Sequence, residues 1–153
     1  MDWNQSRDTQ AACSMGLHCV KAAATLPAST DQTLFTISGG NIFVTLLIGE
    51  VTTAIQSTDP VLTVVANPTT GTDVTLASTV DSKSLEIGGW LLVEGDGTPI
   101  VIGNAGMIPV TGQYNFVVGI GAIILHSAAT KTGATKWEIF YFPLDEGAKV
   151  VSG

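Results

Sequence analysis

The side chains that could carry acid–base or nucleophilic chemistry are few in this sequence. Only two histidines, His18 and His126, could act as bases near neutral pH. His126 ends an apolar run, which is typical of a residue at the end of a strand. The sequence contains no G-x-S-x-G elbow, HExxH helix or phosphate-binding loop. We therefore expect a protein that is not an enzyme.

The two cysteines, Cys13 and Cys19, are six positions apart, and His18 lies beside the second. Metal sites with recognisable sequence signatures have ligands in paired spacings, and no second pair follows here. Three interpretations stay open, namely structural or incidental thiols, a local disulfide, or a metal site shared between subunits. We assign no function to these thiols, and we expect no cofactor and no bound metal.

Carboxylates are more frequent, and two of them at a suitable separation could form a glycosidase pair. Most of them fall where turns or the polar side of a strand are expected, so we interpret them as solvated or turn-capping groups. The run Asp145-Glu146-Gly147 could bind Ca²⁺ at an interface, although it lacks the spacing of a calcium-binding loop.

The composition of the 153 residues restricts the class of partner. Charged residues make up only 12%, hydrophobic residues 45%, and the formal net charge is -7. An acidic chain has no electrostatic footprint for phosphates, so we expect no nucleic-acid partner. The longest apolar stretch, 116–125, is far shorter than the roughly 20 residues of a membrane-spanning helix. The start of the chain lacks the features of a secretory signal, so we expect folding in a cytoplasm.

The pattern from Thr33 onward predicts an all-β fold. Short runs of Val, Ile, Thr and aromatic residues alternate with Gly, Pro, Asn and Asp at intervals of about ten residues, which is typical of an antiparallel sandwich. We predict an antiparallel β-sandwich, jelly-roll or immunoglobulin-like, over residues 26–153, preceded by an extended N-terminal arm over residues 1–25. The expected strands are Thr33–Ser38, Ile42–Ile48, Val51–Gln56, Val61–Ala66, Asp73–Val80, Trp90–Glu94, Pro99–Ile102, Tyr114–Val118, Ala122–Ser127 and Thr135–Phe142.

Two of these strands are apolar at odd and even positions alike. Each sheet of a sandwich has one dry face, so such a strand needs further cover. We predict contacts with sister subunits, made by Phe43, Leu47, Trp137 and Phe140. The alternative is cover by the arm or by a long corner loop of the same chain.

Several stretches of the sequence resemble small virion structural proteins of tailed bacteriophages. The resemblance spans roughly residues 21–151 and does not by itself distinguish head from tail. It is carried by Lys21–Pro27, Leu34–Gly40, Leu47–Gln56, Ala66–Thr72, Ala129–Trp137 and Tyr141–Ala148.

Together, the resemblance, the low charge, the doubly apolar strands and the arm lead us to expect a capsid decoration protein on the virion surface. It would be a homo-oligomer, with a trimer favoured, assembled in the host cytoplasm, and it would bind the major capsid protein through Trp3, Leu17 and Leu26 of the arm. A component of the tail or host-adsorption apparatus is one alternative. Another is a free carbohydrate-binding sandwich that uses Trp90 or Tyr114.

Overall fold

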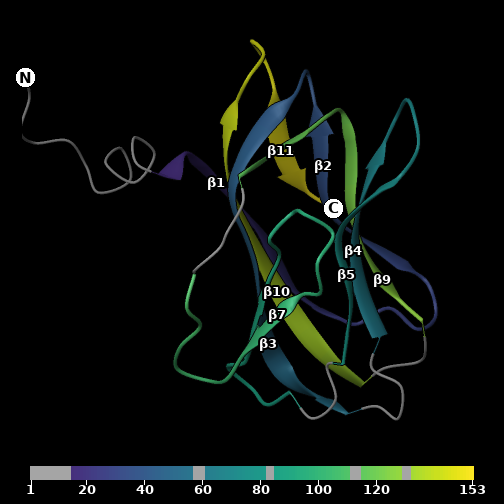
Figure 1. Ribbon diagram of the computed structural model, residues 1–153, viewed down its shortest axis with the longest axis vertical. Helices are drawn as coiled ribbons and strands as arrows, with labels where there is room; N and C mark the ends of the chain where they lie inside the picture. Colours follow the sequence, from purple (N-terminus) through teal and green to yellow (C-terminus); the bar gives the residue numbers. More distant parts are fainter. Residues whose placement is uncertain (1–14, 57–60, 82–84, 111–114, 129–131) are drawn as a thin grey trace, which may run out of the picture.

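The chain folds into two antiparallel β-sheets packed face to face, as the ribbon of the computed structural model shows (Figure 1). The structure describes residues 15–56, 61–81, 85–110, 115–128 and 132–153. The predicted antiparallel β-sandwich is confirmed. The strands are β1 (Leu17–Thr25), β2 (Asp31–Ser38), β3 (Ile42–Gln56), β4 (Val61–Pro68), β5 (Val74–Asp81), β6 (Trp90–Leu92), β7 (Val101–Gly103), β8 (Phe116–Val118), β9 (Gly121–Ser127), β10 (Thr132–Pro143) and β11 (Lys149–Ser152).

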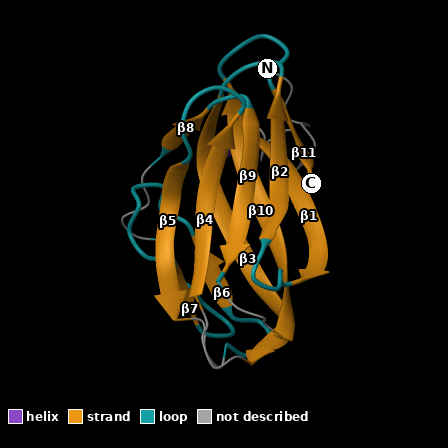
Figure 2. Ribbon diagram, turned by 90° about the vertical axis from the view of Figure 1, so that its right-hand side faces the viewer, coloured by secondary structure: helices purple, strands orange, loops and turns teal. Residues whose placement is uncertain are grey.

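The strand order is that of a jelly roll. Sheet A has the order β1-β10-β3-β6-β7, with β8 also paired to β3. Sheet B, which faces the viewer in Figure 2, has the order β11-β2-β9-β4-β5. Strands near the two ends of the chain pair with each other, and strands nearer its middle pair in turn: β1 with β10, β2 with β9, β3 with β6, and β4 with β5. The further pairs β10–β3 and β9–β4 complete two Greek keys. This order decides between the two sandwich topologies that the sequence left open.

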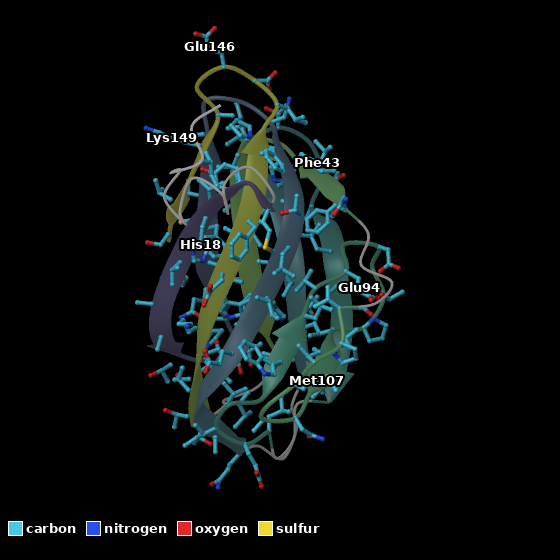
Figure 3. The ribbon with its side chains drawn as sticks, turned by 90° about the vertical axis from the view of Figure 1, so that its left-hand side faces the viewer. His18, Phe43, Glu94, Met107, Glu146 and Lys149 are labelled. Atoms are coloured by element: carbon cyan, nitrogen blue, oxygen red, sulfur yellow. The ribbon has the colours of Figure 1, made fainter. Side chains whose placement is uncertain are left out.

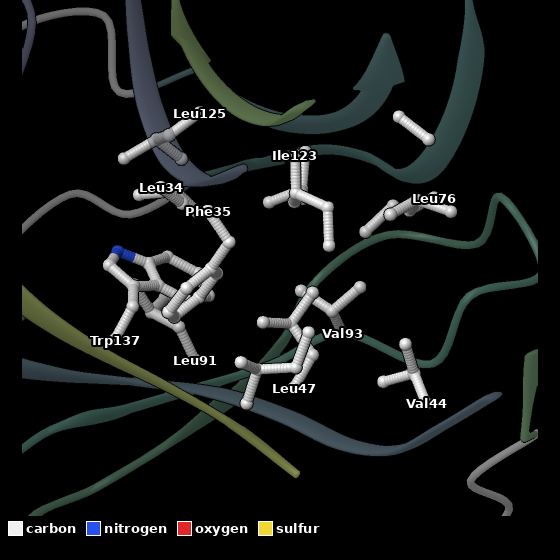
Figure 4. Packing of buried hydrophobic residues seen from close by; sticks show 14 of the residues in the cluster. Leu34, Phe35, Val44, Leu47, Leu76, Leu91, Val93, Ile123, Leu125 and Trp137 are labelled. Atoms are coloured by element: carbon white, nitrogen blue, oxygen red, sulfur yellow. The ribbon is translucent and has the colours of Figure 1, made fainter. Parts of the chain in front are cut away.

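The core lies between the sheets and is built from the inward side of each strand (Figure 4). Strand β10 alternates strictly, with Trp137, Ile139 and Tyr141 buried and their neighbours half-buried. Sheet B contributes Phe35 and Leu125 from the opposite side. Burial of each such side chain stabilises the fold by about 1.5 to 3 kcal/mol.

Strand β3 is one long strand where the sequence predicted two, Ile42–Ile48 and Val51–Gln56, because Gly49 and Glu50 continue the strand. A β-bulge interrupts the strand earlier, because Phe140 pairs with Leu46 while Tyr141 pairs with Val44. Thr45 is the extra residue. Val44 and Leu47 therefore both point into the core although they are three positions apart.

The predicted arm is wrong for residues 17–25, because this segment is an edge strand of sheet A. It pairs with β10 from Leu17↔Tyr141 to Thr25↔Ala134. Most of its side chains are exposed, so it lacks the alternation that marks a half-buried strand. Residues 1–14 lie outside the described part of the chain. Among the residues that the structure describes, no helix is long and apolar enough to cross a membrane.

Candidate interaction surface on sheet A

The outer face of sheet A carries partly exposed apolar side chains. They come from the outward positions of β10, from β3 on both sides of the bulge, and from the edge strand β1. Figure 3 views this face, with His18 on β1 and Phe43 on β3 labelled. We call one set of these residues the sheet A patch: Val20, Phe43, Leu46, Ile48 and Phe140.

A row of four charged or ionisable side chains crosses the same face. His18 Nε2 on β1 lies 2.8 Å from Glu138 Oε2 on β10. Lys136 Nζ, two residues from Glu138 on β10, lies 2.9 Å from Glu138 Oε1 and 3.3 Å from Glu50 Oε2 on β3. The His18 ring also stacks on Phe140, with ring centroids 4.3 Å apart. We call these four residues, in the order His18, Glu138, Lys136 and Glu50, the charged row.

Interactions within the charged row favour the charged forms of Glu138 and Lys136. Burial raises the pKa of the Glu138 carboxyl, but hydrogen bonds from Lys136 and His18 outweigh this effect and hold the pKa below its ordinary value. Hydrogen bonds to Glu138 and then to Glu50 raise the pKa of the Lys136 ammonium. Both groups are therefore charged at neutral pH, and His18 adds a positive charge when it is protonated.

A corner loop covers one end of this face. The segment after β7 folds back so that the Ile108 side chain packs on Gly103, where a Cβ atom would lie only 2.7 Å from it. Leu92, which pairs with Ile48 on the outer side of sheet A, is fully buried there. The chain's own loop thus covers the outer side of sheet A at β6 and β7. The described residues leave the patch on β10 and β3 partly exposed.

The chain enters β1 from above this same face. Gly16 has a φ of 93° and lies flat against β10, where a Cβ atom would overlap the Tyr141 carbonyl. The Thr45 hydroxyl on β3 donates a hydrogen bond of 2.6 Å to the Met15 carbonyl. Leu17 follows with 45% of its surface exposed.

The structure separates the four predicted contacts with sister subunits into two pairs. Phe43 and Phe140 lie in the sheet A patch and are partly exposed. Leu47 and Trp137 have 0% exposure in the core of the same chain, so the prediction is wrong for these two residues. The bulge turns Leu47 inward, and Gly49 leaves the space that the Trp137 indole fills.

The three predicted capsid contacts also divide. Leu17 is exposed, as such a contact requires. Leu26 is only 3% exposed and belongs to the core, so it is not available to a partner. Its backbone N–H donates to the Gly133 carbonyl, which fixes the segment after β1 against β10. Trp3 lies outside the described residues, as do Cys13 and Tyr114.

The outer face of sheet B is different in character. Threonines such as Thr33, Thr36 and Thr75 are exposed there. His126 Nδ1 lies 2.6 Å from Asp31 Oδ1, and both side chains are well exposed to solvent. This pair is a surface contact between β9 and β2, and neither residue lines any of the four pockets characterised in the structure.

Two of these pockets are lined mainly by apolar surface. The apolar pocket beside Pro68, Leu76 and Val118 has a volume of about 130 Å³, below the roughly 300 Å³ of ordinary ligand sites. A more open one of about 300 Å³ is lined by Ile48, Trp90, Gly106, Met107 and Ile108. It offers a ligand an aromatic surface but few polar groups.

The remaining candidate groups have structural partners. Asp145 Oδ2 accepts hydrogen bonds from the Asn41 backbone N–H at 2.7 Å and from its side-chain amide at 2.9 Å, so it caps a turn. Burial raises the pKa of the half-buried Cys19 thiol, which keeps it protonated. Within the described ranges, no three His, Cys, Asp or Glu side chains gather as a metal site would require.

Comparison with protein-family models, with curated proteins and with solved structures gives no match to this chain.

Proposed function

We propose that this chain is a structural protein of a tailed-bacteriophage virion, a decoration protein that binds the major capsid protein of the assembled shell and other copies of itself. The sheet A patch is the observation that carries the proposal. Exposed apolar side chains gathered on one face and rimmed by polar groups mark sites of protein association. The resemblance of residues 21–151 to phage virion proteins supplies the biological setting.

The mechanism we propose is thermodynamic. A protein that binds the assembled shell, but not its dissociated subunits, stabilises the shell by mass action, by about 2.7 kcal/mol per site at a hundredfold excess over the dissociation constant. The net charge of -7 gives the decorated particles like charges, which favours their separation in solution. No chemical step is required.

Contacts with the shell and with sister subunits use different regions in this proposal. The start of β1, with the exposed Leu17, and the preceding segment with Trp3 contact the capsid. The sheet A patch, with Phe43 and Phe140, contacts other copies. Phenylalanine is among the aromatic residues that are enriched at protein–protein interfaces.

The test is quantitative mass spectrometry of purified virions, with the amount of this chain measured against the major capsid protein. A ratio near one, or one to a few, is the expected result. A few copies per particle would favour the tail or host-adsorption apparatus, and absence from particles would rule out a virion role.

The contact region is tested with shells and purified protein. Deletion of residues 1–14 removes no residue of the described strands, the first of which begins at Leu17, and it is expected to abolish binding to expanded shells while circular dichroism stays unchanged. The matched control is Thr36→Ala on the outer face of sheet B, which should bind normally. Unchanged binding by the deletion variant would contradict a role of this segment.

A carbohydrate-binding role is a second candidate because Trp90 lines an open pocket on sheet A. Sugar recognition needs polar groups beside the aromatic ring, and the pocket is lined mainly by apolar residues. Glu50, the cross-strand neighbour of Trp90, already forms an ion pair with Lys136. Retention on a glycan array that is lost in Trp90→Ala, with the fold intact, would favour this candidate.

A further inference from the structure

The charged row alternates in sign across sheet A. His18, Glu138, Lys136 and Glu50 follow one another from β1 through β10 to β3, with 2.8 to 3.3 Å between neighbouring groups. With His18 protonated, the signs read plus, minus, plus, minus. The same row read from its other end is minus, plus, minus, plus.

An alternating row of this kind is complementary to itself. In a contact with two-fold symmetry, if one residue of the first copy meets a second residue of the other copy, the same two residues also meet with the copies exchanged. If the axis passes between Glu138 and Lys136, Lys136 of each copy faces Glu138 of the other. His18 of each copy then faces Glu50 of the other.

We propose that the outer face of sheet A binds a second copy of this chain, related by a two-fold axis through the charged row. The inference deepens the proposed function and rests on the same sheet A patch. It specifies a pair of chains, which differs from the trimer expected from the sequence.

The apolar surroundings of the row support this occupant. Exposed ion pairs contribute little by themselves because water and salt screen them. Here the row runs between Phe140, Val20 and Ile48 of the sheet A patch. Contact between two such faces removes apolar surface from water at the same time as it brings opposite charges together.

The net negative charge of the chain favours self-association through sheet A over other surfaces. A net charge of -7 opposes contact between two copies through most surfaces. The charged row has two acidic and two basic side chains, so its charges balance when His18 is protonated and leave one excess negative charge when it is neutral. The sheet A face therefore permits self-association that a surface with only acidic groups would oppose.

Charge reversal provides the test, with sedimentation velocity of the full chain over a concentration series at about 0.1 M ionic strength. Wild-type protein is expected to form a dimer. Lys136→Glu places like charges opposite Glu138, and Glu138→Lys places like charges opposite Lys136, so each variant alone should dimerise at least about tenfold more weakly. An equimolar mixture of the two variants restores opposite charges and should form the mixed dimer.

The control is Thr36→Glu on the outer face of sheet B, which adds an acidic group away from the contact and should leave dimerisation unchanged. A monomeric wild-type chain, a trimer, or a mixture that fails to rescue dimerisation would overturn the proposal. A dimer that appears only after deletion of residues 1–14 would also overturn it for the full chain, and would identify that segment as the occupant of the face. The assay contains no virions, so its outcome is independent of the copy number that tests the proposed function.

Discussion

Replacement of Gly49 by alanine tests how the longest strand of sheet A accommodates the largest core side chain. A Cβ atom at this position would lie 2.9 Å from Trp137 Cε2 and 3.0 Å from Cδ2 and Cζ2. Carbon atoms in good contact are about 3.5 to 4.0 Å apart, so the overlap is at least about 0.5 Å. The ring cannot easily move, because it is fully buried and its Nε1–H donates to Thr135 Oγ1 at 3.0 Å.

The expected magnitude is the difference between two effects. Overpacking of a well-packed core costs about 1 to 3 kcal/mol. Alanine is favoured over glycine inside a strand by about 0.5 to 1 kcal/mol, because glycine loses more backbone freedom on folding. From the middle of each range, we expect Gly49→Ala to lower the free energy of unfolding by about 1 kcal/mol, which corresponds to about 2 to 4 °C in Tm for a chain of this size.

Urea and thermal unfolding measure this loss. The matched control is Gly119→Ala, where the nearest atom to the added Cβ is Asn41 Oδ1 at 3.3 Å and the change should be within about 0.5 kcal/mol. Trp137→Phe removes atoms that the methyl group meets, so Gly49→Ala should cost less in that background. A cost that is equal in both backgrounds, or a neutral Gly49→Ala, would refute the steric explanation.

Three further predictions concern the charged row, one turn and the sorting of core from surface. Because the pKa of Glu138 lies below its ordinary value of 4.5, its contribution to stability is present above that pH and is lost as pH falls through the lowered pKa. The Tm difference between wild type and Glu138→Gln, followed from pH 7 downward, should therefore vanish in acid. Asp145→Ala leaves the Asn41 N–H groups without their acceptor and should cost about 1 to 2 kcal/mol, with faster hydrogen exchange of the Asn41 amide; slow exchange in the variant would argue against the cap. Leu47→Ala should lower the free energy of unfolding by about 2 to 5 kcal/mol and Phe43→Ala by clearly less, and an inverted order in denaturant titrations would contradict the assigned inner and outer faces.

The sequence predicts the sandwich well where alternation and turn residues are strong. Strand β9 was expected at Ala122–Ser127 and is found at Gly121–Ser127. Edge strands gave weaker signals. The run Ala22-Ala23-Ala24 in β1 has no apolar alternation, since most side chains of this edge strand are exposed and its pairing with β10 shifts register between Lys21 and Ala24.

Local deviations from regular pairing explain the errors at the candidate site. In strands with apolar residues at both odd and even positions, the pattern cannot say which set points inward. The bulge at Thr45 reverses within β3 which positions point inward. Leu47, which we predicted to contact a sister subunit, therefore lies in the core. The charged row was not predicted because its members come from three strands, and their register cannot be read from the sequence. The alternation of β10 could have placed only Lys136 and Glu138 on one side of a strand.

The bulge in β3 also determines where this chain can lose a residue. In a regular strand, deletion of one residue turns every following side chain to the opposite face of the sheet. At the bulge, two consecutive residues face outward opposite a single residue of β10, so the loss of Leu46 would restore regular pairing and keep Val44 and Leu47 directed into the core. Thr45 is less dispensable, since its hydroxyl donates to the Met15 carbonyl at 2.6 Å and also lies 3.2 Å from the Phe140 carbonyl. In a library of single-residue deletions over residues 42–50 of β3, where this is the one register shift against β10, folded survivors should therefore gather at Leu46.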